Sequence, residues 1–439
     1  MTVLQHRVPA LAVALLVAAL VGPRASDAQL AATVPITISG EVRTRSEGDW
    51  PGGAVRSDVY TYMRSRLAVS AAAAEHVRIF AQVQDSRVFG AEGNTSLSNP
   101  DVFELHQGYL ELGSAWGSNN FLARVGRQEI AFGNERLVGA ADWTNTARSF
   151  DGARVTLTPR GEKPGAERWS LTAFIATMED RGRKFGALTS AGTAAAPAPD
   201  HEIAALFATR AIASGALEVT AMYDGGAHYR AFDHSDRSTF DARLRQGAGH
   251  DIGFEIEAAS QLGTQHALPA GAASYVTQEV GAWLVGARIT RPAAAGRRVT
   301  AALGVDVLSG DASATDGSYS AFNTMFATNH PFYGLMDIFT DPAARTNDRG
   351  LVDALATTAI ALPPRTALKI ELHHYAPQAG THSEIGWEAD AIAPVKISAA
   401  ATLELGYTAF HAGPAAAAMG LGADGAWRHW AYLQLKAAF

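Results

Sequence analysis

The chain has 439 residues, no cysteine and a formal net charge of −7 at pH 7. The sequence excludes a helical membrane bundle, because beyond the N-terminal segment no uncharged apolar run reaches about 18 residues. The missing cysteines exclude a disulfide framework, and the acidic balance argues against nucleic acid as a partner. A chain of this length forms either two or three soluble domains or one large barrel.

The N-terminal segment has the pattern of a signal peptide. Arg7 supplies a positive charge, Ala10–Val21 is apolar, and a small-x-small site ends at Ala28. We therefore expect residues 1–28 to be a signal peptide and residues 29–439 to form one outer-membrane β-barrel. The alternative is an uncleaved membrane anchor, for which the apolar run is short.

Apolar and polar positions alternate with a period of two along the rest of the chain. In the first such segment Ile36, Ile38 and Val42 share one face, and Arg43 and Arg45 share the other. The same alternation recurs in the segments 60–69, 76–84, 299–307, 368–373 and 402–408. Each signal is weak alone, but their repetition is typical of a transmembrane barrel with apolar residues outside and polar residues inside. A β-sandwich would need a second buried layer, which the polar faces do not supply.

The C-terminal segment is the clearest of these strands. One face carries Ala431, Leu433, Leu435, Ala437 and Phe439, and the other carries Trp430, Tyr432, Gln434 and Lys436. The sequence thus predicts an all-β fold, a closed antiparallel transmembrane β-barrel of about eighteen strands, with about sixteen as the alternative. We expect the barrel-assembly machinery to bind Phe439, and outer-membrane lipid and lipopolysaccharide to surround the barrel. The alternative is the last strand of a periplasmic β-sandwich.

The connections between strands fall into two sizes. Short ones such as 72–75 and 363–366 are expected to be periplasmic turns, and long ones extracellular loops. The predicted long loops are 47–56, 90–101, 179–200, 224–249 and 310–349. The last of them carries five aromatic residues, too many for a solvated loop. It is expected either to fold into the lumen as a constriction or to pack across the barrel mouth.

Short motifs follow one another in a fixed order along the chain. The N-terminal half carries Gln84–Arg87, Gln107–Leu112, Val125–Ile130, Gly133–Gly139, Trp143–Asn145 and Arg148–Arg154. The C-terminal half adds Ser309–Asp311, Phe322–Phe326, His330–Gly334 and Gly386–Asp390. This succession resembles the alginate-export family of outer-membrane barrels. The resemblance implies a monomeric barrel with an arginine-lined, anion-selective pore, through which a polyuronate leaves the periplasm in the name-giving member.

Arginines are the candidate pore-lining and substrate-binding residues. Seven arginines lie on the polar face of their predicted strands or next to it, namely Arg43, Arg45, Arg64, Arg66, Arg78, Arg124 and Arg154. To these we add Arg127 and Arg136. A guanidinium keeps its charge and binds a carboxylate through two parallel hydrogen bonds. A row of them would draw anions into a pore. The alternative is a ladder of Arg–Glu pairs that braces the wall, with Glu41, Glu104, Glu111 and Asp151 as partners.

A second group of residues is expected to hold a loop inside the barrel by hydrogen bonds. This predicted inner network consists of Gln84, Asp85, Gln128, Glu129, Trp143, Arg148 and Asp151. The segment 126–136 could instead be a catalytic or recognition motif. The network is the simpler interpretation, because two arginines, a glutamine and two glutamates surround a glycine turn there.

The C-terminal half departs from a simple basic pore. The polar faces of its predicted strands carry eight acids, namely Glu255, Glu257, Asp306, Asp353, Glu371, Glu388, Asp390 and Glu404. Few cations match them, mainly Lys369, His373 and Lys436. Either arginines lie across the lumen from these acids, or the pore has mixed charge. The substrate is therefore either an anionic polysaccharide of the polyuronate type or small anions. A general polar-solute porin, or a plugged barrel with an adhesion or structural role, remains the alternative.

Enzyme and cofactor motifs are missing from the sequence. It has no nucleophile elbow, zinc-protease motif, phosphate-binding glycine loop or cysteine pair. His373 and His374 are adjacent, so in a strand they point to opposite faces and only one can enter the lumen. Asp306, Asp311 and Asp316 lack the alternating oxygen ligands of a calcium loop. We expect no enzymatic activity, no cofactor and no metal.

Overall fold

The computed structural model describes most of the chain beyond the N-terminal segment. The described residues are 34–51, 57–89, 102–116, 119–160, 169–179, 201–227, 234–247, 252–267, 276–293, 298–313, 316–362, 365–380 and 383–439. The predicted signal peptide lies outside them, and so do the predicted loop 90–101 and all but the first residue of 179–200. No helix within the described ranges is long and apolar enough to cross a membrane.

Long β-strands make up most of the described residues. They are β1 (Ile36–Trp50), β2 (Asp58–Ala74), β3 (Val77–Phe89), β4 (Val102–Trp116), β5 (Asn119–Gln128), β6 (Phe150–Pro159), β7 (Trp169–Glu179), β8 (His201–Ile212), β9 (Gly215–Ala227), β10 (His234–Gln246), β11 (Gly253–Ala267), β12 (Val276–Arg291), β13 (Val299–Leu308), β15 (Leu351–Leu362), β16 (Thr366–Ala376), β17 (Gly386–Lys396), β18 (Ala401–Ala412) and β19 (Trp427–Ala438). Three short elements join them, namely β14 (Ser318–Tyr319), α2 (Pro342–Arg345) and the 3-10 turn η1 (Ala417–Met419).

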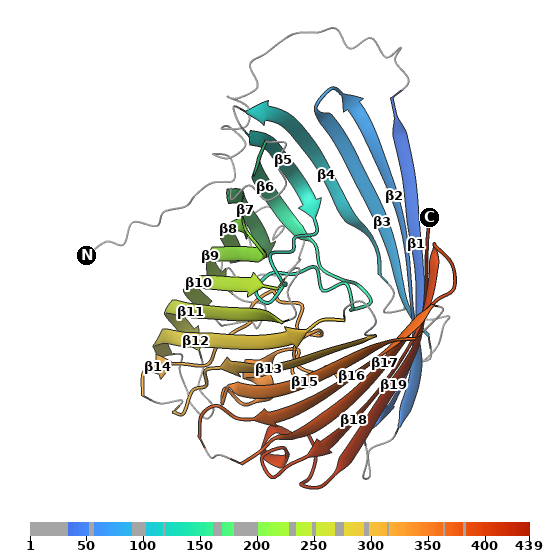
Figure 1. Cartoon of the computed structure of the whole chain (residues 1–439). Helices are drawn as coiled ribbons and strands as arrows, with labels where there is room; N and C mark the ends of the chain where they lie inside the picture. Colours follow the sequence, from blue (N-terminus) through green and yellow to red (C-terminus); the bar gives the residue numbers. More distant parts are fainter. Residues whose placement is uncertain are drawn as a thin grey trace, which may run out of the picture.

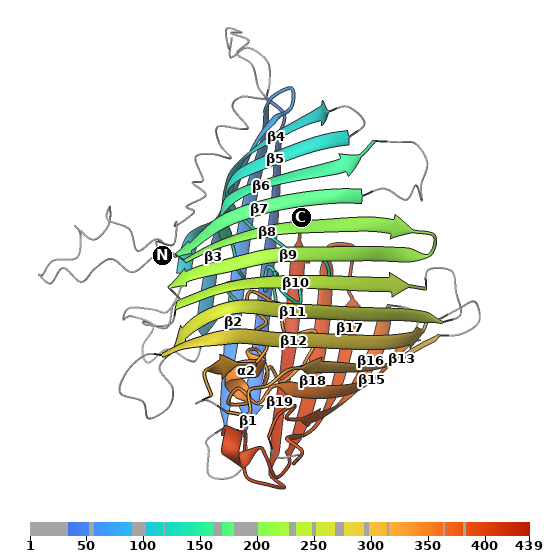
Figure 2. The same cartoon turned by 90° about the vertical axis from the view of Figure 1, so that its left-hand side faces the viewer.

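The long strands close into a barrel. Each pairs antiparallel with its neighbours in sequence order, and β1 pairs with both β2 and β19. The two-residue β14 pairs parallel with β12 inside a loop, so β13 pairs directly with β15. Among the described residues the wall therefore has 18 strands, which confirms the predicted fold class and the preferred strand number. Figure 1 shows the ring in sequence colours, and Figure 2 shows β4 to β12 side by side as one wall.

The two faces of the wall follow the predicted alternation. In β19 the side chains of Leu433 and Leu435 are exposed on the outside, whereas Trp430 and Tyr432 are buried on the inside. Phe439 lies on the outer face and closes the seam, because its backbone exchanges two hydrogen bonds with Gly40 at the start of β1. The apolar outer face is suited to lipid, and the polar inner face needs the partners described below.

One predicted loop is wrong, and one begins later than expected. The segment 224–249 is mostly strand, because β9 continues to Ala227 and β10 occupies His234–Gln246. Its composition, rich in small and polar residues, suggested a loop, but Ser235, Arg237 and Thr239 alternate with outward side chains and are buried inside the barrel. The predicted loop 47–56 likewise starts only after β1 ends at Trp50.

Two connections fold into the lumen. The first inner loop, residues 129–149, joins β5 to β6, and the second inner loop, described at residues 309–313 and 316–350, joins β13 to β15 (teal and orange in Figure 1). Their side chains form a large part of the buried core, including Ile130, Val138, Phe322, Tyr333 and Phe339. Of the two placements expected for 310–349, the structure favours the one inside the lumen, since this loop contacts inner-face residues of β16 and β17.

Candidate functional site

Four arginines on β1 and β2, here called the loop-bound arginines (Arg43, Arg45, Arg64 and Arg66), bind the tip of the first inner loop. Arg43 donates to the carbonyl oxygens of residues 142 and 144, at 2.7 and 2.8 Å. Arg45 donates to the carbonyl oxygen of residue 143 at 2.8 Å, and Arg64 to that of residue 142 at 3.0 Å. These predicted pore-lining residues thus face the lumen, but their guanidinium groups hold a backbone turn.

The carboxylate of Asp142 is the charged partner in this contact. Its Oδ1 accepts from Arg64 Nη2 at 2.8 Å and from Arg66 Nη1 at 3.0 Å. Burial raises the pKa of Asp142, but the two guanidinium groups outweigh it and hold this pKa below its ordinary value. Sequence analysis missed Asp142. Its one signal was its place directly before the Trp143–Asn145 motif, and nothing in the sequence shows which loop residue reaches the wall.

Trp143 is packed between the two inner loops and the wall, as the predicted inner network requires. The Arg45 guanidinium lies 3.8 Å from the centre of one of its rings, and the His330 ring stacks on it at 3.9 Å. Its indole N–H donates to Asp337 of the second inner loop at 3.0 Å. The indole therefore ties both inner loops to β1.

Four more residues of the predicted inner network also lie on the inside. Gln84 donates to the carbonyl oxygen of Thr146 at 2.7 Å, and Glu129 contacts His106 at 2.8 Å. Arg148 donates to carbonyl oxygens of both inner loops, at residues 139, 326 and 327. Gln128 is buried and donates to backbone carbonyl oxygens at residues 126 and 152.

Three predicted inner residues lie instead on the outer face, where they form ion pairs. Arg127 binds Asp151 at 2.6 Å, and Asp85 accepts from Arg87 at 2.8 Å. Neighbouring residues of a strand point to opposite faces, so Asp85 cannot share the inside with Gln84, nor Arg127 with Gln128. The prediction placed both members of each neighbouring pair on one side.

Arg136 was predicted to line the pore but is buried between the first inner loop and the inner face of the wall. It binds Glu257 of β11 at 2.9 Å and Asp306 of β13 at 3.1 Å, and its Nη1 donates to the Tyr333 hydroxyl at 3.1 Å. Burial alone would lower the pKa of Arg136, but the carboxylates of Asp306 and Glu257 hold it well above its ordinary value. An arginine of the first inner loop thus lies across from C-terminal acids, one of the two arrangements expected.

Further C-terminal acids hold the second inner loop. Glu388 accepts from the amide of Met336 at 2.8 Å, and Asp390 from the amide of Leu335 at 3.2 Å. The two inner loops also bind each other, through a bridge between Val138 and Phe326. These carboxylates therefore serve as acceptors for backbone N–H groups, which explains their presence without matching arginines.

A second basic group stays outside these loop contacts, and we call it the turn-side arginines (Arg78, Arg124 and Arg154). Arg78 is the second residue of β3, next to the short turn from β2, and Arg124 on β5 and Arg154 on β6 follow it in one row of the register. Arg78 and Arg124 share Glu111, at 2.5 and 2.6 Å, and Arg154 lies directly opposite Arg124 in the register. Two guanidinium groups thus share one glutamate, and a third arginine stands beside them on the next strand.

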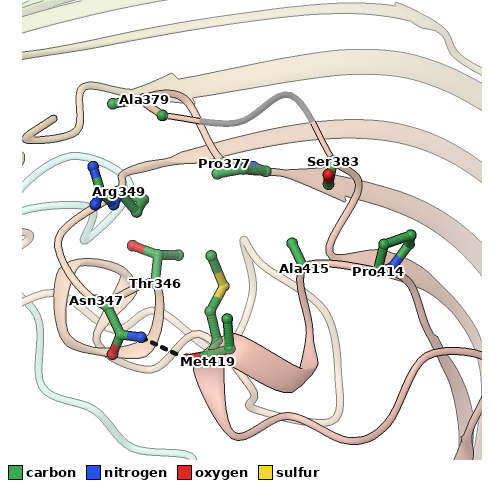
Figure 3. A pocket seen from close by; sticks show the side chains of 11 residues that line it. Thr346, Asn347, Arg349, Pro377, Ala379, Ser383, Pro414, Ala415 and Met419 are labelled. Atoms are coloured by element: carbon green, nitrogen blue, oxygen red, sulfur yellow. Dashed lines mark hydrogen bonds between the residues drawn. The ribbon is translucent and has the colours of Figure 1, made fainter.

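A pocket of about 540 Å³ opens where three connections meet at the other end. It is lined by Thr346, Asn347, Arg349, Pro377, Ala379, Gly380, Ser383, Pro414, Ala415, Ala418 and Met419. Asn347 donates to the carbonyl oxygen of Ala418 at 2.9 Å and so joins the second inner loop to the connection before β19 (Figure 3).

The described residues contain no cluster of three or more histidine, cysteine or carboxylate side chains arranged to hold a metal ion. His373 is buried inside beside Asp353 at 3.0 Å, whereas His374 points outward to Glu384 at 3.2 Å. This opposite orientation is the one predicted for adjacent histidines in a strand.

The closed wall, its apolar outer face and the two inner loops define an outer-membrane β-barrel of the porin type. Residues 34–340 match the model of the alginate export family, and the chain belongs to this family. The sequence resemblance is thereby confirmed, and with it the outer-membrane location.

Solved structures share the fold at low identity. OccK8 (OprE) of Pseudomonas aeruginosa is 11% identical with a TM-score of 0.58, and the match covers 92% of this chain and 98% of that one. The outer membrane protein opdK of the same organism is 11% identical with a TM-score of 0.55, and the match covers 92% of this chain and 98% of that one. OccK2 (OpdF) of Pseudomonas aeruginosa, solved in complex with glucuronate, is 11% identical with a TM-score of 0.56. This match covers 92% of this chain and 98% of that one. A comparison with curated protein sequences finds no match.

Proposed function

We propose that the protein is a channel for anionic solutes, with a polyuronate-like polysaccharide as its substrate and the periplasm as the side of entry. The family supports a channel for such a polymer. The glucuronate complex of OccK2, a protein of the same fold, adds support for a uronate ligand. One chain closes the whole barrel and encloses a lumen of its own, so we also propose that the protein is a monomer. We propose further that lipopolysaccharide surrounds it and that the barrel-assembly machinery binds Phe439.

The observation that carries the proposal is the excess of positive charge among the turn-side arginines. Glu111 is shared by Arg78 and Arg124, and Arg154 stands beside them. In outer-membrane barrels the short turns face the periplasm, so Arg78 lies where a polymer would enter for export, and Arg124 and Arg154 extend the basic group from there into the lumen. The side chain of Arg78 is 42% exposed, whereas the side chains of Arg45, Arg64 and Arg66 are 3%, 0% and 9% exposed.

Ion selectivity of the reconstituted protein tests this proposal. A planar bilayer with a KCl gradient across it should give a reversal potential on the anion-selective side. Replacing the turn-side arginines together (R78Q/R124Q/R154Q) should reduce that preference. The matched control is R127Q, which removes an arginine of the outer-face pair with Asp151 and should leave the reversal potential unchanged. A cation-selective wild-type channel would contradict the proposal.

The substrate class is tested by blocking the current. An oligouronate should halve the conductance at a lower concentration than a neutral oligosaccharide of equal length does. Equal block by both would favour a general porin for polar solutes. Loss of the preference in the triple variant would tie the recognition to the turn-side arginines.

The inner loops favour one second candidate, a barrel whose lumen stays plugged and whose loops serve adhesion or a structural role. Its supporting observation is that both inner loops are fastened to the wall, the first by the loop-bound arginines and by Arg136, and the second by Glu388 and Asp390. A reconstituted protein that conducts no ions, although it is folded, would favour this candidate over a channel.

A further inference from the structure

We infer that Arg64 and Arg66 form a carboxylate-binding site that Asp142 occupies as an internal ligand, and that a uronate carboxylate of the passing polymer takes this site by displacing Asp142. The inference builds on the proposed function, because it assigns a binding step to the same channel. It makes Asp142 a residue that determines how strongly the channel binds its substrate.

The geometry is that of a carboxylate held between two guanidinium groups. Both arginines bind the same oxygen of Asp142, at 2.8 and 3.0 Å. The side chains of Arg64 and Arg66 are 0% and 9% exposed, so they are fixed in place by the wall. Fixed, weakly hydrated guanidinium groups bind carboxylates well, because little side-chain entropy is lost on binding.

The carboxylate of Asp142 is not the only anchor of the loop tip. Arg43 and Arg45 bind backbone carbonyl oxygens of residues 142 to 144, and these bonds remain if the Asp142 side chain turns away. Nearly half of the Asp142 side chain, 49%, is exposed to the lumen. A solute carboxylate can therefore reach Oδ1 from the open side and replace it while the loop stays anchored.

The neighbouring carboxylates are less suited to this exchange. Glu41 also binds Arg64, but it is a β1 residue with 16% of its side chain exposed and is held by Lys436 at 2.7 Å. Glu129 lies 3.4 Å from Arg66 and is engaged by His106 at 2.8 Å. Asp142 is the most exposed of the three, and it comes from the loop.

The substitution D142N tests the inference, because asparagine keeps the shape of the side chain and removes the competing charge. In planar bilayers we expect a linear oligogalacturonate to half-block D142N at about a tenfold lower concentration than wild type, since one charge-assisted hydrogen-bonded contact no longer competes. A neutral oligosaccharide of equal length should block both proteins equally. The matched control is D151N, which removes a carboxylate bound to an arginine on the outer face, and it should behave as wild type.

The other outcomes are distinct. An unchanged half-block concentration in D142N would overturn the inference, and so would an equal gain for the neutral oligosaccharide, which would mean a wider lumen. The gain should vanish in D142N/R66Q, where the site itself is damaged. If neither wild type nor variant prefers the oligogalacturonate over the neutral probe, the proposed function fails, and the inference fails with it. A wild type that prefers it and a D142N that matches wild type contradict the inference alone.

Discussion

Replacing Arg136 with methionine should loosen both inner loops against the wall without unfolding the barrel. The substitution removes the guanidinium that Glu257 and Asp306 share and the bond to the Tyr333 hydroxyl. Removing one partner of a buried ion pair costs about 3–5 kcal/mol, because the remaining charge is left uncompensated. Glu257 keeps one neutral donor, Asn134 at 2.8 Å, so we expect the lower end of this range.

Hydrogen exchange of the inner-loop amides measures this loss of stability in the loops themselves. A loss of about 3 kcal/mol in the opening free energy of the loops corresponds to about a hundredfold faster exchange. This acceleration should appear in peptides from residues 129–149 and 309–350 of R136M. Peptides from β16 and β18 should exchange as in wild type, since the pairing of the wall is untouched.

A neutralised triple variant provides the control. In R136M/E257Q/D306N no charge is left unpaired, and exchange in the inner loops should return most of the way to the wild-type rate. Inner-loop peptides of R136M that exchange within about threefold of wild type would refute the reasoning, because the two loops would then be held by other contacts.

Three further predictions concern single residues of the loop tip, the wall and the seam. The pKa of Asp142 lies below its ordinary value of 3.8, so its contribution to anchoring the loop is complete above that value and is lost as the pH falls through the lower pKa. Relative to the intrinsic exchange rate at each pH, protection of the loop tip should thus fall from pH 5 to pH 3 in wild type, and by less in D142N; an equal fall would be evidence against this role. Gly126 has φ +128°, and an added Cβ would lie 2.3 Å from a backbone oxygen of β4, so G126A should lower the yield of heat-modifiable, folded barrel. G281A in β12, where a Cβ meets nothing within 4 Å, should fold normally, and equal yields of the two variants would contradict the steric argument. Phe439 packs at the seam beside Gly40 on the outer face, so F439A should slow assembly into the outer membrane while the assembled channels conduct as wild type; normal assembly kinetics would speak against its proposed role.

The wall of the barrel could be predicted from the sequence because its signal is periodic. Alternation assigns a side to every residue of a strand, and this assignment held for Leu433, Leu435, Trp430 and Tyr432 in β19. The same rule, applied strictly, would have placed Arg127 on the outside. The error arose because a motif was treated as one unit, although its neighbouring residues point to opposite faces.

The contents of the lumen could be predicted only in part. The aromatic residues of 310–349 indicated that this segment is buried, since five aromatic side chains are costly to leave in solvent. The partner of each lumen arginine could not be predicted, because a loop returning into the barrel brings together residues about a hundred positions apart, as Arg43 and Asp142 are. No periodic pattern encodes such contacts, so the loop-bound and turn-side arginines looked alike in the sequence.

The central claim is that the turn-side arginines make the lumen selective for anions. The most direct test is the reversal potential of the reconstituted wild-type protein across a KCl gradient, repeated with R78Q/R124Q/R154Q. The account predicts an anion preference that falls in the triple variant. A cation preference, or an anion preference that the triple variant leaves unchanged, would contradict it.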